Sequence, residues 1–281
     1  MILEKTCDLV LQIYKYRKIP PPRISNVTIG LNYTGVEIEA LCYDPFLGLA
    51  QTLSSVVQET NCNKNDFAGT LTERSVFELM RWSQEEPSLK KVIGVATLNA
   101  VSQLLLEITN PYLAIQGDLV EYLKIDKDAK IIFIGLMEPI VKQVIKITKL
   151  ITIVENNPLT STTYGSFRVK REIDQLNNDD FPADVLFCTG TTLINNTLED
   201  ILSKFKKKAQ KVVVIGPTAS MIPDILFDYG VDVVGGMTIK NSSVALKVIK
   251  EGGGTKIFKQ FGKKYNFIKE IDNKKNQDEI I

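Results

Sequence analysis

Residues 189–192, with the sequence TGTT, combine hydroxyl side chains with a glycine, residue types that suit the binding of an anionic or polar group. An apolar run at 185–187 precedes them, and apolar residues at helical spacing follow. Between a buried strand and a helix, such residues leave backbone N–H groups accessible to an anion. We therefore predict that Thr189, Gly190 and Thr191 form an open, ligand-binding loop.

Polar or glycine-containing segments also follow four other apolar runs. They are Gly135-Leu136-Met137-Glu138, Glu155-Asn156-Asn157-Pro158, Gly216-Pro217-Thr218 and Gly235-Gly236. In open parallel sheets, ligands bind outside the carboxyl ends of the strands. We therefore predict ligand-binding roles for Gly216, Pro217 and Thr218 as well.

Glu155 follows Gly135 by 20 residues, the spacing at which dinucleotide folds place the acid that binds the ribose. The loop at Gly135 nevertheless lacks the G-x-G-x-x-G pattern, so a pyrophosphate would meet side chains there. We therefore do not expect NAD as a cofactor. Glu155 is instead expected to hold a hydroxyl or an amine of the ligand.

Asn99 is the candidate from the first half of the chain. It lies in a helical segment, 88–108, whose small residues Gly94, Ala96 and Ala100 would let another backbone approach closely. Two interpretations stay open: a core asparagine with satisfied hydrogen bonds, or a ligand contact. In the second, Asn99 reaches toward residues 189–192 across a cleft between two domains.

The amino-acid composition limits which metal, catalytic and nucleic-acid sites the chain can form. The 281 residues include no histidine, the commonest metal ligand and general base. A metal site made by side chains would therefore need Asp, Glu, Cys or carbonyl oxygens. Lys and Arg total 34 against 33 Asp and Glu, which gives no basic footprint for nucleic acid. The four cysteines form no C-x-x-C pair, and no disulfide framework is expected.

The patterns predict two domains. In the first, a helix over 2–16 and a hairpin with strands near 27–31 and 36–42 indicate an α+β unit. In the second, apolar runs alternate with helical segments, which predicts a doubly wound, Rossmann-like parallel sheet covered on both faces. The five runs are 130–134, 150–154, 184–188, 211–215 and 231–234.

The predicted boundaries are 1–111 for the first domain, 112–268 for the second and 269–281 for a polar tail. No signal peptide is visible at the start of the sequence. The longest apolar region, 92–108, is too short and too polar to span a bilayer. We therefore expect a cytoplasmic protein without membrane insertion.

Several long motifs, in order, resemble those of one family. The motifs TGTTLINNTLEDIL, VIGPTASMIPDILFDYGVDVVGG and EGGGTKIF are similar to the DUF364 family, whose description names heavy-metal chelation. VTIGLNYTGVEIEA, GLAQTL and GVATLNAV are similar to its N-terminal partner module, DUF4213. The resemblance implies an enolase-N-terminal-like domain joined to a Rossmann-like one, a shared cleft, and a link to heavy metals or metal chelators.

The leading hypothesis is a protein that binds a small anionic molecule or a metal chelate in the interdomain cleft. The alternative is an enzyme, a transferase or lyase, acting on an anionic metabolite, with Glu155, Glu138 or Cys188 in acid–base or nucleophilic roles. A non-enzymatic scaffold is a third interpretation, but it leaves the glycine-rich and Asn-rich loop ends unexplained. The sequence names neither the ligand nor the oligomeric state.

Overall fold

The computed structural model describes residues 1–54 and 66–269 as a mixed α/β protein with two sheets. Cys62 and all but the first residue of the predicted tail, 269–281, lie outside the described residues. The α-helices are α1 (Ile2–Tyr16), α3 (Val76–Arg81), α4 (Leu89–Thr109), α5 (Leu119–Tyr122), α6 (Glu138–Val144), α7 (Leu198–Phe205), α8 (Asp224–Asp228), α9 (Ser242–Lys250) and α10 (Thr255–Phe258). Short 3-10 turns include η3 (Trp82–Gln84), η6 (Gly190–Leu193) and η7 (Pro217–Ala219).

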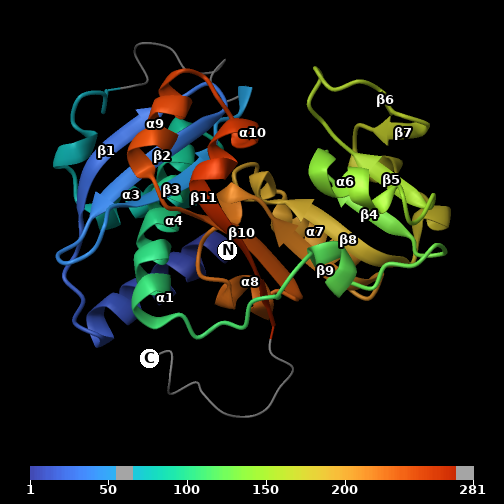
Figure 1. Cartoon of the computed structure of the whole chain (residues 1–281), viewed down its shortest axis with the longest axis horizontal. Coiled ribbons are helices and arrows are strands. Elements are labelled where there is room, and N and C mark those ends of the chain that lie inside the picture. Colours follow the sequence, from blue (N-terminus) through green and yellow to red (C-terminus); the bar gives the residue numbers. More distant parts are fainter. Residues whose placement is uncertain (55–65, 270–281) are drawn as a thin grey trace.

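The smaller sheet is antiparallel, in the order β1-β2-β3, and lies at one end of the molecule (Figure 1). Its strands are β1 (Arg23–Ile29), β2 (Tyr33–Glu39) and β3 (Phe46–Gln51). The predicted hairpin is confirmed as β1 and β2, with Val27 opposite Val36. The third strand, β3, was not predicted.

The larger sheet has the order β11-β10-β9-β8-β4-β5-β7-β6. Its strands are β4 (Ile131–Ile134), β5 (Ile151–Val154), β6 (Thr163–Tyr164), β7 (Phe167–Lys170), β8 (Ala183–Thr189), β9 (Ala209–Ile215), β10 (Val233–Ile239) and β11 (Gly262–Ile268). Pairing is parallel from β10 through β7, and the two edge strands, β11 and β6, are antiparallel to their neighbours. All five predicted apolar runs fall on strands of this sheet.

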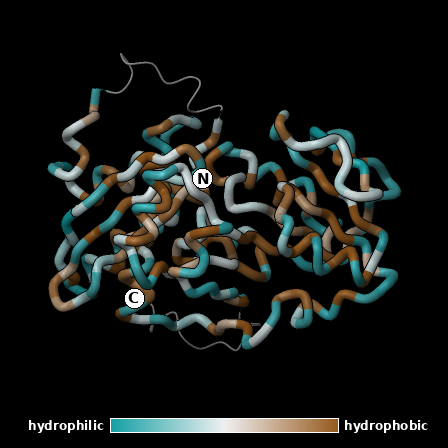
Figure 2. Tube along the Cα trace, turned by 45° about the horizontal axis from the view of Figure 1, so that its top comes forward, coloured by the Kyte–Doolittle hydropathy of each residue, from teal (hydrophilic) through white to brown (hydrophobic). Residues whose placement is uncertain are grey.

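Both faces of the larger sheet are covered by helices, and alternate residues of each strand therefore point into two different cores. Phe133 and Phe187 stack at 4.9 Å on the face covered by α5 and α6. Leu186 and Val214 face the core that includes α7, α8, α1 and α4. Figure 2 shows hydrophobic stretches through the interior of the molecule, whereas hydrophilic and hydrophobic residues are mixed in the outer loops.

Helix α4 is the central element of the first half. By length and composition it could cross a membrane, so the expectation that region 92–108 is too short and too polar to do so is wrong. However, 83% of its most apolar window is buried inside the protein. Sixteen of its residues are buried, because one side packs against β3 and others contact η3 and η7. It is therefore a core helix.

The second half of the chain also covers the small sheet. Helix α9 contacts β1 and β2 and lies beside them in Figure 1. Leu47 and Leu49 of β3 share a core with Leu246 and Ile249 of α9. The small sheet therefore lies between α4 on one face and α9 on the other.

Candidate functional site

The carboxyl ends of β4, β5, β8 and β9 meet at one edge of the larger sheet. Strand β4 pairs with β5 on one side and with β8 on the other. The chain passes from β4 to β5 and later crosses back to form β8 on the opposite side of β4, so the direction of winding reverses between β4 and β8. Gly135 and Thr189 lie at this reversal, and a Cβ built on Gly135 would come within 2.6 Å of Thr189 Cγ2. Gly135 also has a φ of +97°. Such a reversal is where open parallel sheets bind ligands.

Glu155 lies at this edge, and its carboxylate already accepts two backbone hydrogen bonds. The N–H of Leu136 donates to Oε2 at 2.9 Å and the N–H of Asn157 donates to Oε1 at 2.8 Å. The guanidinium of Arg171 donates to three carbonyls of the same loop, at Glu155, Asn157 and Thr160. Glu155 thus joins two strand-end loops, and ligand binding by it stays a prediction.

Asn99 is fully buried in the seam between the two halves. Its Nδ2 donates to the carbonyl of Leu49 at 2.7 Å and to that of Thr218 at 2.9 Å. The side chain therefore reaches the loop after β9 rather than residues 189–192. This placement agrees with the core-asparagine interpretation, although Oδ1 is buried and has no hydrogen-bond partner among residues 1–54 and 66–269.

Gln51, at the end of β3, connects the first half to both threonine-containing turns. Its Oε1 accepts a hydrogen bond from the Thr191 hydroxyl at 2.6 Å, and its backbone N–H donates to Thr218 Oγ1 at 3.0 Å. Both threonines are buried. Gln51 was not among the site residues predicted from the sequence; its one sequence signal was its place in the motif GLAQTL.

The segment after β8 is a 3-10 turn, and the expectation of an open loop is wrong. The Thr189 hydroxyl accepts from the N–H of Thr191 at 3.4 Å, and the Thr192 hydroxyl donates to the carbonyl of Thr189 at 2.7 Å. A Cβ on Gly190 would lie 2.9 Å from the backbone nitrogen of Ala219. These side-chain hydrogen bonds close the turn, and Gly190 is needed because η7 packs against it.

Part of the edge stays accessible. Thr189, Gly216 and Pro217 are half-buried. Gly216 has a φ of +130°, and within the described part of the chain, its two sequence neighbours aside, a Cβ there would have one atom within 4 Å, the nitrogen of Gly190 at 3.9 Å. The turn η6 begins at this edge with Gly190, whose N–H group lies there, whereas Pro217, the first residue of η7, has no N–H group. The edge thus offers a hydroxyl and backbone groups to a polar ligand.

The two other candidate catalytic side chains are poorly placed for nucleophilic chemistry. Cys188 is fully buried, and burial raises the pKa of its thiol well above the usual range. Glu138 is exposed and accepts a hydrogen bond from Lys142 at 2.7 Å. Among residues 1–54 and 66–269, Cys, Asp and Glu do not gather in groups of three that could hold a metal ion.

Comparisons with known proteins give the chain its relatives. The model of the family DUF364, described as "Putative heavy-metal chelation", matches residues 118–268. The model of DUF4213, with the same description, matches residues 15–102. A protein of Methanocaldococcus jannaschii, Uncharacterized protein MJ0500, is 27% identical over 275 residues, which cover 94% of this chain and 97% of that protein.

Two crystal structures share the fold. A DUF364-family protein of unknown function from Pyrococcus horikoshii aligns with a TM-score of 0.71 and 25% identity, over 95% of this chain and 99% of that one. A DUF364-family protein from Desulfitobacterium hafniense aligns with a TM-score of 0.68 and 16% identity, over 92% of this chain and 100% of that one. The match therefore extends over both halves of the chain.

Proposed function

The chain belongs to the DUF364 family, and on that premise we propose that it binds a small anionic molecule, or a metal held by such a molecule, between its two halves. The ligand lies at the carboxyl edge of the larger sheet, against Thr189, Gly216 and Pro217. Thr189 lies at the reversal between β4 and β8, and Gly216, after the next strand β9, lies close to Gly190; this convergence is the observation that supports the proposal. We further propose a cytoplasmic location.

We also propose the finer fold assignment. Residues 1–111 form an enolase-N-terminal-like domain and residues 112–268 a Rossmann-like domain. The support is the small antiparallel sheet with its long helix α4 in the first, and the parallel sheet covered on both faces in the second. NAD is not the ligand in this proposal, because the N–H of Leu136 in the first loop already donates to Glu155.

A pre-formed metal chelate fits the edge better than a bare heavy-metal ion. Soft metals bind thiolate and imidazole ligands. The sequence contains no histidine, and Cys188 behind the edge is fully buried. Hydroxyl and backbone groups instead suit the carboxylate or phosphate oxygens of an organic chelator. The metal is then cargo that arrives with its own ligands.

The test is native mass spectrometry and elemental analysis of the protein purified from its own source. We expect an organic molecule to copurify, and any metal to be present only together with it. A metal in stoichiometric amount without an organic molecule, or a protein with nothing bound, would contradict the proposal.

A matched pair of variants localises the site. Thr189→Val removes the hydroxyl with little change in shape, and loss of a hydrogen bond to a charged group should weaken binding of the copurified molecule about tenfold. Thr163→Val, on the exposed strand β6, is the control and should bind as wild type does. Equal binding by both variants would place the ligand elsewhere.

A further inference from the structure

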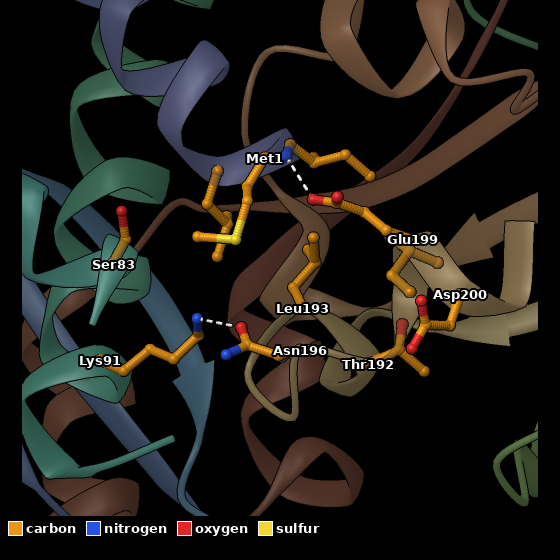
Figure 3. A pocket seen from close by; sticks show the side chains of 11 residues that line it. Met1, Ser83, Lys91, Thr192, Leu193, Asn196, Glu199 and Asp200 are labelled. Carbon is orange, nitrogen blue, oxygen red and sulfur yellow. Dashed lines mark hydrogen bonds between the residues drawn. The ribbon is translucent and has the colours of Figure 1, made fainter. Parts of the chain in front are cut away.

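A cavity of about 210 Å³ lies between the two halves, beside the segment that follows Thr191. Thr192, Leu193, Asn196, Glu199 and Asp200 line it from the second half, and Lys91 and Ile2 from the first (Figure 3). It shares none of the carboxyl-edge residues Thr189, Gly216 and Pro217. It is therefore a second site, separate from the one proposed above.

Lys91 brings a buried cation to this cavity. The residue is 1% exposed. Its Nζ donates to the carbonyl of Glu85 at 3.0 Å and to Oδ1 of Asn196 at 2.5 Å, which leaves one of its three N–H donors without a partner in the described part of the chain. Among the described residues, no carboxylate lies within ion-pair distance of the Lys91 ammonium.

The electrostatic setting of Lys91 is unusual for a structural lysine. Burial lowers the pKa of its ammonium, and the carboxylates of Glu86 and Glu199 act in the opposite direction. Buried charges in proteins are normally paired, because desolvation of an unpaired ion costs several kcal/mol. An anion in the cavity would supply the counter-ion and accept the remaining hydrogen bond.

Carboxylates line a different part of the same cavity. The N–H of Ile2 donates to Oε1 of Glu199 at 2.6 Å, and Oε2 has no partner among the described residues. Figure 3 shows Glu199 and Asp200 on the other side of Leu193 from Lys91. Leu193 therefore lies between the two charged regions, and Leu198 and Ile2 add further apolar lining to the cavity. The cavity thus has a cationic end, an anionic end and an apolar middle.

We propose that this cavity binds a small amino acid as its zwitterion, with the carboxylate on Lys91, the ammonium group on Glu199 and an aliphatic side chain against Leu193. The volume agrees with such a molecule, because pockets for drug-sized ligands are larger, roughly 300–1,000 Å³. One charged group of the ligand pairs with each charged end of the cavity, so neither end stays uncompensated.

Calorimetric titration of the full chain with three probes tests the pairing. The probes are L-leucine, 4-methylpentanoate, which lacks the amino group, and 3-methylbutylamine, which lacks the carboxylate. We expect leucine to bind, and each analogue to bind at least tenfold more weakly. Equal affinity for all three, or a Kd for leucine above about 10 mM, would overturn the proposal.

Variants then assign the two ends. Lys91→Met should abolish leucine binding, whereas Lys247→Met, an exposed lysine on α9, should leave it unchanged. Glu199→Gln retains an acceptor for Ile2 but loses the charge, so it should weaken leucine about tenfold and leave 4-methylpentanoate unaffected. Circular dichroism checks folding. If Lys91→Met does not fold, the Glu199 variant decides. If a folded Lys91→Met or Glu199→Gln variant binds leucine as tightly as wild type does, the assignment of the two cavity ends is wrong.

This test is independent of the proposed function. Thr189→Val should bind leucine as wild type does, because Thr189 does not line the cavity. Loss of the copurified molecule with retained leucine binding would support two sites. Loss of leucine binding in Thr189→Val would overturn the separation of the cavity from the carboxyl edge.

Discussion

Two buried side-chain amides on α4, those of Asn99 and Gln103, connect the two halves of the molecule by hydrogen bonds. Asn99 and Gln103 are one helical turn apart and therefore lie on the same face of the helix. Gln103 Nε2 donates to the carbonyl of Ser220 at 2.7 Å, and its Oε1 accepts from the Thr238 hydroxyl at 2.6 Å. Together with the Asn99 contacts to Leu49 and Thr218, these bonds fix α4 against the loop after β9. The position of the carboxyl edge thus depends on buried side chains of another element, α4.

Asn99→Ala should lower the free energy of unfolding by about 2–4 kcal/mol, because two buried carbonyls, of Leu49 and Thr218, lose their amide donor. Urea denaturation followed by circular dichroism measures this change. Asn156→Ala, at an exposed position after β5, is the control and should stay within about 0.5 kcal/mol of wild type. A change below about 1 kcal/mol in Asn99→Ala would mean that the seam does not depend on this amide.

At the scale of elements, close backbone approach positions α4. A Cβ on Gly48 in β3 would lie 2.0 Å from the carbonyl oxygen of Ala96 and 2.3 Å from the nitrogen of Ala100. On the helix itself, a Cβ on Gly94 would lie 2.0 Å from the nitrogen of Ser83 in η3. The expectation that the small residues of α4 admit another backbone is therefore confirmed.

Gly48→Ala should be strongly destabilising, by about 3 kcal/mol or more, because the added methyl group meets backbone atoms that no side-chain rotation can move. The matched control is Gly254→Ala, where a Cβ would have only ordinary contacts, 3.7 Å from Cβ of Asn32. Thermal unfolding of both variants gives the comparison. A melting temperature for Gly48→Ala equal to that of Gly254→Ala would show that β3 and α4 separate without cost.

The same packing explains which elements the sequence predicts. The strands of the larger sheet are continuous apolar runs between helices, so their pattern is distinctive. Strand β3 is buried on both faces, with Phe46 and Ala50 in one core and Leu47 and Leu49 in another, so it shows no alternation. The turn after β8 closes through threonine side chains, which local sequence does not distinguish from an open loop.

The candidate site residues likewise divide into those that could be predicted from the sequence and those that could not. A parallel sheet places the ends of its strands at one edge, so Glu155, Thr189 and Gly216 could be assigned to one place from the sequence. The cavity at Lys91 could not, because it forms where α1, the start of α4 and residues 192–200 meet. Its one sequence signal was the pair Lys90-Lys91 at the start of a largely apolar helix.

At the scale of the whole molecule, the two halves share their cores. One hydrophobic cluster includes Val10 of α1 and Leu104 of α4 together with Leu186 and Val214 of the larger sheet. A second joins β3 to α9 and to Met237 of β10. Each half therefore covers an apolar face of the other, and burial of that surface stabilises both.

The last prediction follows from this sharing: the segments 1–111 and 112–268 should not fold separately. Without α9, residues 1–111 would expose Leu47 and Leu49 to water, and residues 112–268 would lose the cover that α1 and α4 give to one face of the larger sheet. The full chain should unfold in one cooperative urea transition, whereas each fragment should show no sharp transition and weak near-ultraviolet circular dichroism. Mixing the fragments should restore part of the signal, because the missing surfaces are then supplied in trans. A fragment that unfolds cooperatively at the midpoint of the full chain would instead show that the shared cores form only after each half has folded.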